Sequence, residues 1–379
     1  MARRRPVSAS LPVFPWDTLA DVTALARSHH DGIVDLSVGT PVDPVAPLIR
    51  EALAAASSAP GYPTTAGTPA LRASAAAALS RRYGITEMAD DAVLPVIGTK
   101  ELIAWLPTLL GLGSGDLIVV PELAYPTYEV GAQLAGAQVV RADSLMQLGP
   151  QLMPNALRVS RSSQALVYLN SPSNPTGKVL GVEHLRKMVG WARERGALIA
   201  SDECYLGLGW DAEPVSVLHP SVCDGDHTGL LAVHSLSKTS SLAGYRAGFV
   251  AGDPAVVAEL LAVRKHAGMM VPTPVQAAMV AALDDDAHER EQRERYARRR
   301  AVLLHALQST GLTVDNSEAG LYIWGTRGEP CRDTVAWLAQ VGILVAPGEF
   351  YGPRGSHHVR VALTATDERI AAAVQRLTA

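Results

Sequence analysis

The chain has 379 residues, of which 48% are hydrophobic and 18% charged, so it can bury a large core and form more than one domain. Its 33 basic and 37 acidic residues give a formal net charge of −4, which provides no general attraction for nucleic acid or an anionic membrane. The three cysteines are far apart and odd in number, which argues against a disulfide framework or a zinc site and favours a reducing, cytoplasmic compartment. Prolines and small residues follow the arginines at 3–5, so we expect neither a signal peptide nor a membrane span.

Short apolar segments of strand length recur between residues 91 and 252. Two of the segments that separate them, 99–110 and 183–195, have the apolar spacing of amphipathic helices. Strands that are apolar on both faces and alternate with helices are typical of a buried, parallel sheet in an α/β protein. The expected strands are 93–97, 117–120, 166–169, 198–200, 230–233 and 249–251.

The sequence changes character after residue 284. Residues 288–300 are densely charged and 301–307 are apolar, which predicts one long, largely solvated helix that bridges two parts of the protein. A smaller α+β unit is expected from the segments 312–324, 342–347 and 358–363. We therefore expect the large domain to end near residue 283 and the small domain to include 284–379.

Polar residues follow five of the expected strands. Ligands of open α/β sheets bind outside the carboxyl ends of the strands, so these residues are expected to meet at one site. The convergence of five strand ends indicates a ligand-binding site more strongly than any single motif does. The residues are Gly98, Thr99 and Lys100 after the first strand, then Tyr125, then 170–177, then Asp202, and finally 235–238.

The central motif is His234-Ser235-Leu236-Ser237-Lys238, followed by Arg246. A lysine amine forms a Schiff base with an aldehyde, while hydroxyls and a guanidinium bind a phosphate dianion, so the set suits a phosphate-bearing aldehyde cofactor. Alone, the motif is more typical of a serine-rich turn with a surface lysine than of a cofactor site. Asp202 alone would be a capping residue and Asn174 a turn residue. Their order along the chain with Lys238 and Arg246 favours the functional interpretation.

The ordered set Asn174, Asp202, Tyr205, Lys238 and Arg246 resembles the fold-type I pyridoxal-phosphate enzymes, specifically the class I and II aminotransferases. The resemblance extends over most of the chain. It implies an α/β, aspartate-aminotransferase-like fold. A large cofactor-binding domain over 46–283 has a mostly parallel, mixed sheet flanked by helices, and a smaller α+β domain is formed by 1–45 together with 284–379. It also implies pyridoxal 5′-phosphate as the cofactor, and an amino acid and a 2-oxo acid as substrates.

The resemblance implies a role for each matching residue. Lys238 forms the Schiff base and carries the proton, and Asp202 keeps the pyridine nitrogen protonated. Asn174 and Tyr205 hydrogen-bond the phenolic oxygen of the ring, and Tyr125 stacks on its face. The phosphate is bound by Ser235, Ser237, Arg246, the backbone of Gly98, Thr99 and Lys100, and, across the interface of a homodimer, Tyr62.

Two positions correspond to the substrate site of the family. Arg360 matches the arginine that clamps the α-carboxylate beside Asn174, and the planar fork of a guanidinium suits bidentate binding. The backbone of Gly39 approaches the same carboxylate. No metal site is expected, because the pairs His29-His30 and His357-His358 have no carboxylate or cysteine at ligand spacing.

Stretches near the beginning of the chain are similar to actinobacterial N-succinyldiaminopimelate aminotransferases, most clearly 11–19, 31–44 and 59–71. This similarity implies ping-pong transfer, through Lys238, between a succinylated diaminopimelate and the glutamate/2-oxoglutarate pair. Aspartate-specific relatives carry an arginine for the distal carboxylate in a stretch that corresponds to 267–274, which has none here. The alternatives are an aminotransferase of broader aromatic or branched-chain range, a lyase or decarboxylase of the same fold, and a cofactor-binding sensor.

Overall fold

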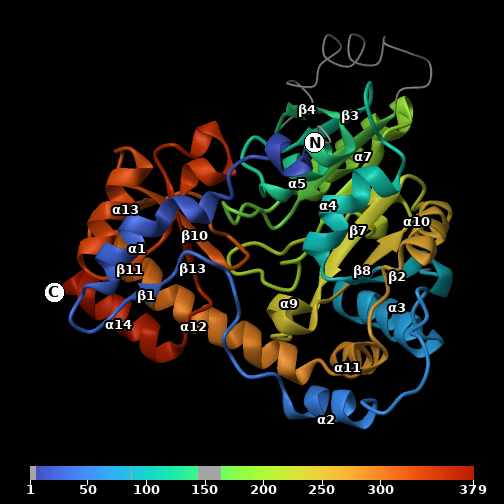
Figure 1. Cartoon of the computed structure of the whole chain (residues 1–379), viewed down its shortest axis with the longest axis horizontal. Coiled ribbons are helices and arrows are strands. Elements are labelled where there is room, and N and C mark those ends of the chain that lie inside the picture. The colour runs from blue at the N-terminus through green and yellow to red at the C-terminus, as the bar shows by residue number, and fades with distance from the viewer. Residues whose placement is uncertain (1–5, 87, 144–163) are drawn as a thin grey trace, which may run out of the picture.

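The centre of the computed structural model, which describes residues 6–86, 88–143 and 164–379, is a seven-stranded mixed sheet of order β2-β8-β7-β6-β5-β3-β4 (Figure 1). The arginines at 3–5 lie outside the described residues. The strands are β2 (Val93–Ile97), β3 (Leu117–Val120), β4 (Gln138–Arg141), β5 (Ala165–Asn170), β6 (Leu198–Asp202), β7 (Leu230–Ser235) and β8 (Ala247–Gly252). The predicted α/β class with a mostly parallel, mixed sheet is confirmed.

One of the strands expected to be parallel is antiparallel. β8 runs opposite to both of its neighbours, β2 and β7, whereas β3, β4, β5, β6 and β7 pair in parallel. Parallel strands need a crossover of about a dozen residues or more, and the connection from Ser235 to Ala247 is shorter than that. It holds only the short helix α9 (Leu236–Thr239) and a 3-10 turn, η5 (Ala243–Tyr245).

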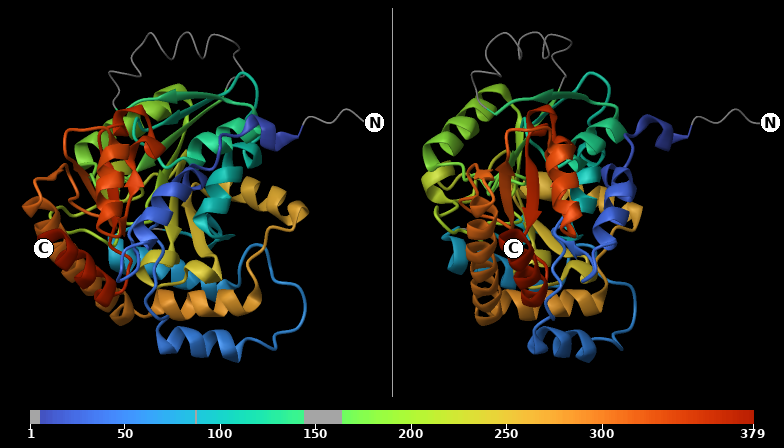
Figure 2. Two further views of the ribbon diagram at one scale, coloured as in Figure 1. Left: turned by 60° about the vertical axis from the view of Figure 1, so that its left-hand side comes forward. Right: turned by 90° about the vertical axis from the view of Figure 1, so that its left-hand side faces the viewer.

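Helices cover both faces of the sheet, because successive side chains of a strand point to opposite faces. Val93 packs in the core beneath α3 (Pro69–Tyr83), α7 (Val182–Arg195) and α11 (Thr273–Asp284). Leu94 packs in the opposite core beneath α4 (Thr99–Leu109), α5 (Thr127–Ala135) and α10 (Pro254–Ala267). On the first face α2 (Pro47–Ala55) lies against α11, at the lower edge of both views in Figure 2. The short helix α8 (Pro220–Cys223) follows β6.

A second, antiparallel sheet of order β12-β13-β10-β9 lies on the left in Figure 1. Its strands are β9 (Thr313–Val314), β10 (Tyr322–Thr326), β12 (Ala346–Pro347) and β13 (Val359–Ala362). The N-terminal strand β1 (Val34–Asp35) pairs with β11 (Ile343–Leu344) beside this sheet. The helices α1 (Ala20–Arg27), α13 (Cys331–Gln340) and α14 (Asp367–Thr378) pack around it. Within the described residues, no helix is long and apolar enough to cross a membrane.

The long helix expected from 288–307 is α12 (Ala287–Ser309), but the prediction that it is largely solvated is wrong for one face. The charged residues on that face are buried because they are paired. Arg299, only 3% exposed, donates to Asp43 (2.6 Å) and Asp367 (2.6 Å). Buried charges are tolerated only with such partners.

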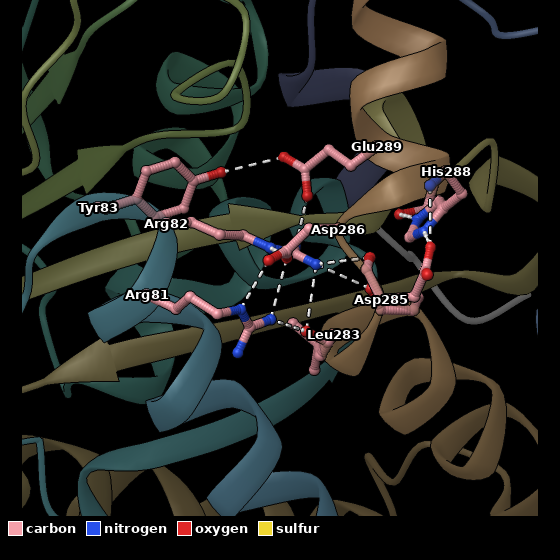
Figure 3. A network of polar contacts seen from close by, with 10 residues as sticks. Arg81, Arg82, Tyr83, Leu283, Asp285, Asp286, His288 and Glu289 are labelled. Atoms are coloured by element: carbon pink, nitrogen blue, oxygen red, sulfur yellow. Dashed lines mark hydrogen bonds and ion pairs between the residues drawn. The ribbon is translucent and has the colours of Figure 1, made fainter.

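The first turn of α12 is joined to the end of α3 by the ionic network in Figure 3. Arg82 pairs with Asp286 (2.7 Å) and Glu289 (2.5 Å), and Arg81 pairs with Asp286 (2.7 Å). The hydroxyl of Tyr83 donates to Glu289 (3.4 Å). These contacts fix α12 to the large sheet before the helix crosses to the antiparallel sheet.

Candidate active site

Lys238 lies in α9, a single turn that starts where β7 ends. The local sequence stabilises this turn, because the Ser235 hydroxyl accepts the N–H of Ser237 (3.1 Å) at its N-terminus. The Lys238 ammonium donates to the carbonyl oxygen of Gly39, which brings the N-terminal segment to the strand ends. From the other side, the hydroxyl of Tyr296 in α12 donates to the backbone carbonyl of Lys238 (3.2 Å).

An anion cradle lies beside this turn, at the N-terminus of α4. Gly98 has a φ of +76° and no side chain caps the helix, so backbone N–H groups of the first turn, including that of Lys100, have no partner within the helix. A β-carbon on Gly98 would lie 2.3 Å from Nη2 of Arg246, so the guanidinium packs directly against this residue. The side chain of Lys100 instead lies over the Phe14 ring (5.5 Å to its centroid), which leaves its backbone for the cradle.

Ser235 and Ser237 belong to the same corner of the sheet. Ser235 pairs across the strands with Gly248, where a β-carbon would lie 3.1 Å from the methyl group of Thr99. The predicted phosphate ligands of the chain therefore come together, with the exception of Tyr62. That side chain is 97% exposed, in the loop between α2 and α3, and does not reach this site within one chain.

Asp202 ends β6 as a buried carboxylate, 5% exposed. It accepts hydrogen bonds from the hydroxyl of Tyr128 (2.7 Å) and the N–H of Cys204 (3.2 Å). Burial raises the pKa of Asp202, and these two bonds and the Lys238 charge oppose the rise. Such a carboxylate suits a protonated nitrogen as its partner. Tyr128 was not expected at the site, although it lies one helical turn after Tyr125 in the same motif.

Asn174 and Arg360 meet beneath the antiparallel sheet, although 186 positions separate them in the chain. Nη1 of Arg360 donates to Oδ1 of Asn174 (2.8 Å) and Nη2 donates to the carbonyl of Ser37 (2.8 Å). The guanidinium lies between two aromatic rings, at 3.9 Å from the Tyr322 centroid and 4.8 Å from the Tyr351 centroid. Nε has no partner, and no acidic side chain among the described residues forms an ion pair with this buried cation. A carboxylate of a ligand would provide the missing anion.

Tyr205 and Tyr322 place two buried hydroxyls 3.2 Å apart between Lys238 and Arg360. A β-carbon on Gly39 would lie 2.2 Å from the Tyr322 hydroxyl, so only glycine fits against it. Neither Tyr322 nor Tyr351 was predicted to belong to the site. Tyr322 enters it because β10 pairs with β13, and no local signal reveals that pairing.

Tyr125 lies between β3 and α5, with its ring edge-on to Tyr128 at 5.8 Å. Burial raises the pKa of Tyr125 to about 12, so its hydroxyl stays protonated at neutral pH. The aromatic side chain predicted to stack on a ring is therefore fixed at the carboxyl end of the sheet.

One expectation about histidines needs correction, because the His29-His30 pair does have a carboxylate beside it. Asp31 and the two histidines place ligand atoms within 4.8 Å of one another at the protein surface. A cluster at the protein surface without buried ligands does not by itself form a metal site. The candidate active-site residues described above do not contact this cluster.

The fold and the site geometry agree with the family to which the sequence is similar. Residues 31–377 match the family of class I and II aminotransferases. The chain belongs to this family. A protein of Mycobacterium tuberculosis named "Probable aminotransferase Rv1178" is 79% identical over 99% of this chain and 87% of its own length. The 4-dedimethylamino-4-oxo-anhydrotetracycline transaminase OxyQ of Streptomyces rimosus is 58% identical over 97% of this chain and 99% of its own length.

Among solved structures, this aminotransferase superposes on one titled "probable N-succinyldiaminopimelate aminotransferase" from Thermus thermophilus. The TM-score is 0.84 at 27% identity, over 96% of this chain and 99% of that one. As a class I and II aminotransferase, the protein depends on pyridoxal phosphate.

The residues present fit this cofactor. The cradle offers donors for a phosphate, because the Arg246 guanidinium packs against Gly98 beside the uncapped N–H groups of the first turn of α4. Lys238 provides an amine for the aldehyde, and Asp202 a buried carboxylate for the ring nitrogen. The chain therefore provides a partner for the phosphate, the aldehyde and the ring nitrogen of pyridoxal phosphate.

Proposed function

We propose that this aminotransferase is an N-succinyl-LL-2,6-diaminopimelate:2-oxoglutarate aminotransferase that works by a ping-pong mechanism in the cytoplasm. The observation that supports an amino-acid and 2-oxo-acid substrate is the buried Arg360 guanidinium without an acidic partner. A guanidinium binds a carboxylate through two parallel hydrogen bonds, and a substrate without a carboxylate leaves the buried Arg360 cation without an anion. The site therefore strongly favours a substrate with an α-carboxylate.

In the proposed mechanism, Lys238, Asp202 and Tyr205 are the catalytic residues. When bound, pyridoxal phosphate supplies an aldehyde for amine exchange and a ring that takes up electrons from the substrate α-carbon. Nζ of Lys238 holds and moves the proton of that carbon, and it must be neutral to accept it. Asp202 holds a proton on the ring nitrogen through a charge-assisted hydrogen bond. Tyr205 and Asn174 orient the ring by its phenolic oxygen.

The substrate is held at its carboxylate by Arg360, Asn174 and the backbone of Gly39. Gly39 also accepts a hydrogen bond from Lys238, so carboxylate binding and the position of the amine are linked through one residue. Water is excluded on this side because the Arg360 guanidinium is buried against the rings of Tyr322 and Tyr351.

We further propose a homodimer in which Tyr62 completes the phosphate site of the neighbouring subunit. Its 97% exposure supports this, because a large aromatic side chain that projects from a loop is well suited to be covered by a partner. We propose the same domain limits as above, 46–283 and 1–45 with 284–379. The pairing of β1 with β11 supports the inclusion of the N-terminal segment in the small domain.

Diaminopimelate specificity is supported by the similar N-terminal stretches and by the Thermus relative. The stretch 267–274, between α10 and α11, contains no arginine for a short distal carboxylate. The remote carboxylates of such a substrate need cations, and the candidates in the sequence are Lys100, Lys265 and Arg354. In the structure Lys100 lies over the Phe14 ring and Arg354 lies 3.7 Å from Glu122. A second candidate is a transaminase for a bulky ketone, which the 58% identity to OxyQ favours.

The test is a panel of amino donors with the purified holoenzyme and 2-oxoglutarate. N-succinyl-LL-diaminopimelate is compared with aspartate, an aromatic amino acid, a branched-chain amino acid and an amine without a carboxylate. We expect the highest kcat/KM for the succinylated donor. A preference for the aromatic or branched-chain donor would favour the broader aminotransferase, and turnover of the carboxylate-free amine alone would contradict the role of Arg360.

A further inference from the structure

The hydroxyls of Tyr205 and Tyr322 form a buried pair, and the proposed function uses only one of them. Tyr205 follows β6 and Tyr322 starts β10, so they come from different sheets and meet at 3.2 Å. Their rings are edge-on at 5.7 Å, which fixes both hydroxyls. In the described part of the chain, the Tyr322 hydroxyl has no other hydrogen-bond partner than Tyr205.

The surroundings decide which hydroxyl donates. The Tyr322 ring lies 3.9 Å from the Arg360 guanidinium, and its hydroxyl packs against Gly39, the residue that accepts the Lys238 hydrogen bond. Burial acts to raise the pKa of Tyr322, but the charges of Arg360 and Lys238 bring it below its ordinary value. Burial and its tyrosine neighbour raise the pKa of Tyr205 well above its ordinary value. A cation beside a hydroxyl makes it the better hydrogen-bond donor, and the Arg360 guanidinium lies against Tyr322, so we assign Tyr322 as the donor and Tyr205 as the acceptor.

We propose that Tyr322 is a positioning residue of the transamination site: its hydroxyl donates to Tyr205 and directs the Tyr205 proton toward the phenolic oxygen of pyridoxal phosphate. This inference rests on the role proposed above for Tyr205. A hydroxyl that accepts one hydrogen bond is polarised and becomes a stronger donor in the next, so the two bonds reinforce each other.

The consequence is measurable at the imine that Lys238 forms with the cofactor. A donor to the phenolic oxygen stabilises its negative charge and thereby lowers the pKa of the neighbouring imine nitrogen. Loss of the Tyr322 hydroxyl weakens that donor and raises the imine pKa. The titratable and charged groups that face the pair come from every element packed around it. They are Lys238 from α9, Arg360 from β13, Asp202 at the end of β6, Cys204 after it, Tyr125 before α5, Tyr128 in α5, Tyr296 in α12, and Tyr351 before β13.

The experiment is a pH titration of the imine absorbance of the holoenzyme, without substrate, in four variants. Tyr205→Phe should raise the imine pKa, and Tyr322→Phe should raise it by a smaller amount, about 0.5 to 1, as expected for one neutral hydrogen bond. The double variant should match Tyr205→Phe alone, because Tyr322 acts through Tyr205. Tyr351→Phe is the matched control: its ring also lies beside Arg360, at 4.8 Å, but its hydroxyl has no hydrogen-bond partner among the described residues, so the imine pKa should not change.

Three results would overturn the inference, and they are distinguishable. If Tyr205→Phe raises the pKa but Tyr322→Phe leaves it unchanged, the positioning role is wrong and the proposed role of Tyr205 stands. If neither variant changes the pKa, the assignment of Tyr205 to the phenolic oxygen fails and the positioning role fails with it. Additive shifts in the double variant would also contradict the relay, because they require Tyr322 to act independently.

Discussion

Replacement of Asp202 by Asn separates its electronic role from its part in cofactor binding. Asn keeps the size of the side chain and can still bond to Tyr128 and the N–H of Cys204, since a hydroxyl donates or accepts. It removes the negative charge that favours a protonated ring nitrogen. The cofactor should still bind, because the cradle at Gly98 and Arg246 and the amine of Lys238 are unchanged.

The magnitude follows from the burial of the group. Asp202 is 5% exposed, so no water replaces the lost charge. A charge-directed hydrogen bond in such a site contributes about 3–4 kcal/mol to the transition state, which is roughly a 10²- to 10³-fold fall in rate. The loss should appear in α-proton removal, because negative charge reaches the ring only in that step.

The assay is rapid-mixing kinetics of the first half-reaction at saturating cofactor, with protonated and α-deuterated donor. Glu203→Gln is the matched control, one position along the chain. Its carboxylate points to the other face of the sheet, where Oε1 accepts the N–H of Val217 (2.8 Å). We expect a near-normal rate for this control. Normal cofactor binding together with wild-type proton removal in Asp202→Asn would refute the reasoning and remove Asp202 from the ring nitrogen.

Three further outcomes are expected. Mixing Tyr62→Phe with Lys238→Ala subunits should restore activity, since some heterodimers then contain one complete site; full turnover by a strictly monomeric protein would contradict this. Arg360→Lys should lower kcat/KM at least about 30-fold through loss of the bidentate geometry, with cofactor absorbance unchanged, and a normal kcat/KM would remove Arg360 from the carboxylate site. Burial raises the pKa of Glu203 from 4.5 to about 7, so the folded protein binds more protons than the unfolded chain between these values and its stability falls as pH rises through that window. The pKa difference of 7 − 4.5 = 2.5 corresponds to about 3 kcal/mol of folding free energy. As the pH rises from 5 to 8, the melting temperature of Glu203→Gln should therefore increase relative to that of wild type. Burial lowers the pKa of His234 to about 3, so His234 makes the stability rise with pH, but it is present in both proteins. If the difference in melting temperature between Glu203→Gln and wild type stayed constant with pH, Glu203 would be ionised in the folded protein.

The strand ends of the large sheet could be predicted because each carries its own local signal. An apolar segment followed by a glycine, a carboxylate or a lysine marks the end of a strand, and the rule for open α/β sheets places these ends together. β2 and β3 begin and end where predicted, and β5, β6, β7 and β8 are longer by two or three residues. β4 was missed because its half-exposed edge position does not require a continuous apolar segment.

The partners of the predicted residues could not be found in the same way. Tyr205 and Tyr322 are 117 positions apart, and Tyr128 is 74 positions from Asp202. Such contacts depend on which strands pair and how the two sheets meet, which hydrophobic patterns do not encode. The buried face of α12 was missed for a related reason. A densely charged segment predicts exposure to solvent, and only the tertiary structure brings Asp43 and Asp367 to Arg299 as buried partners.

The helix α12 links parts of the molecule that other elements keep separate. Its first turn is bound to α3 by Glu289, its middle holds the backbone of Lys238 through Tyr296, and Arg299 binds the C-terminal helix through Asp367. One helix thus holds both sheets and the turn that carries the amine. Substitutions at its ion pairs with Arg82 or Asp367 are therefore expected to change the rate of turnover as well as the stability of the fold.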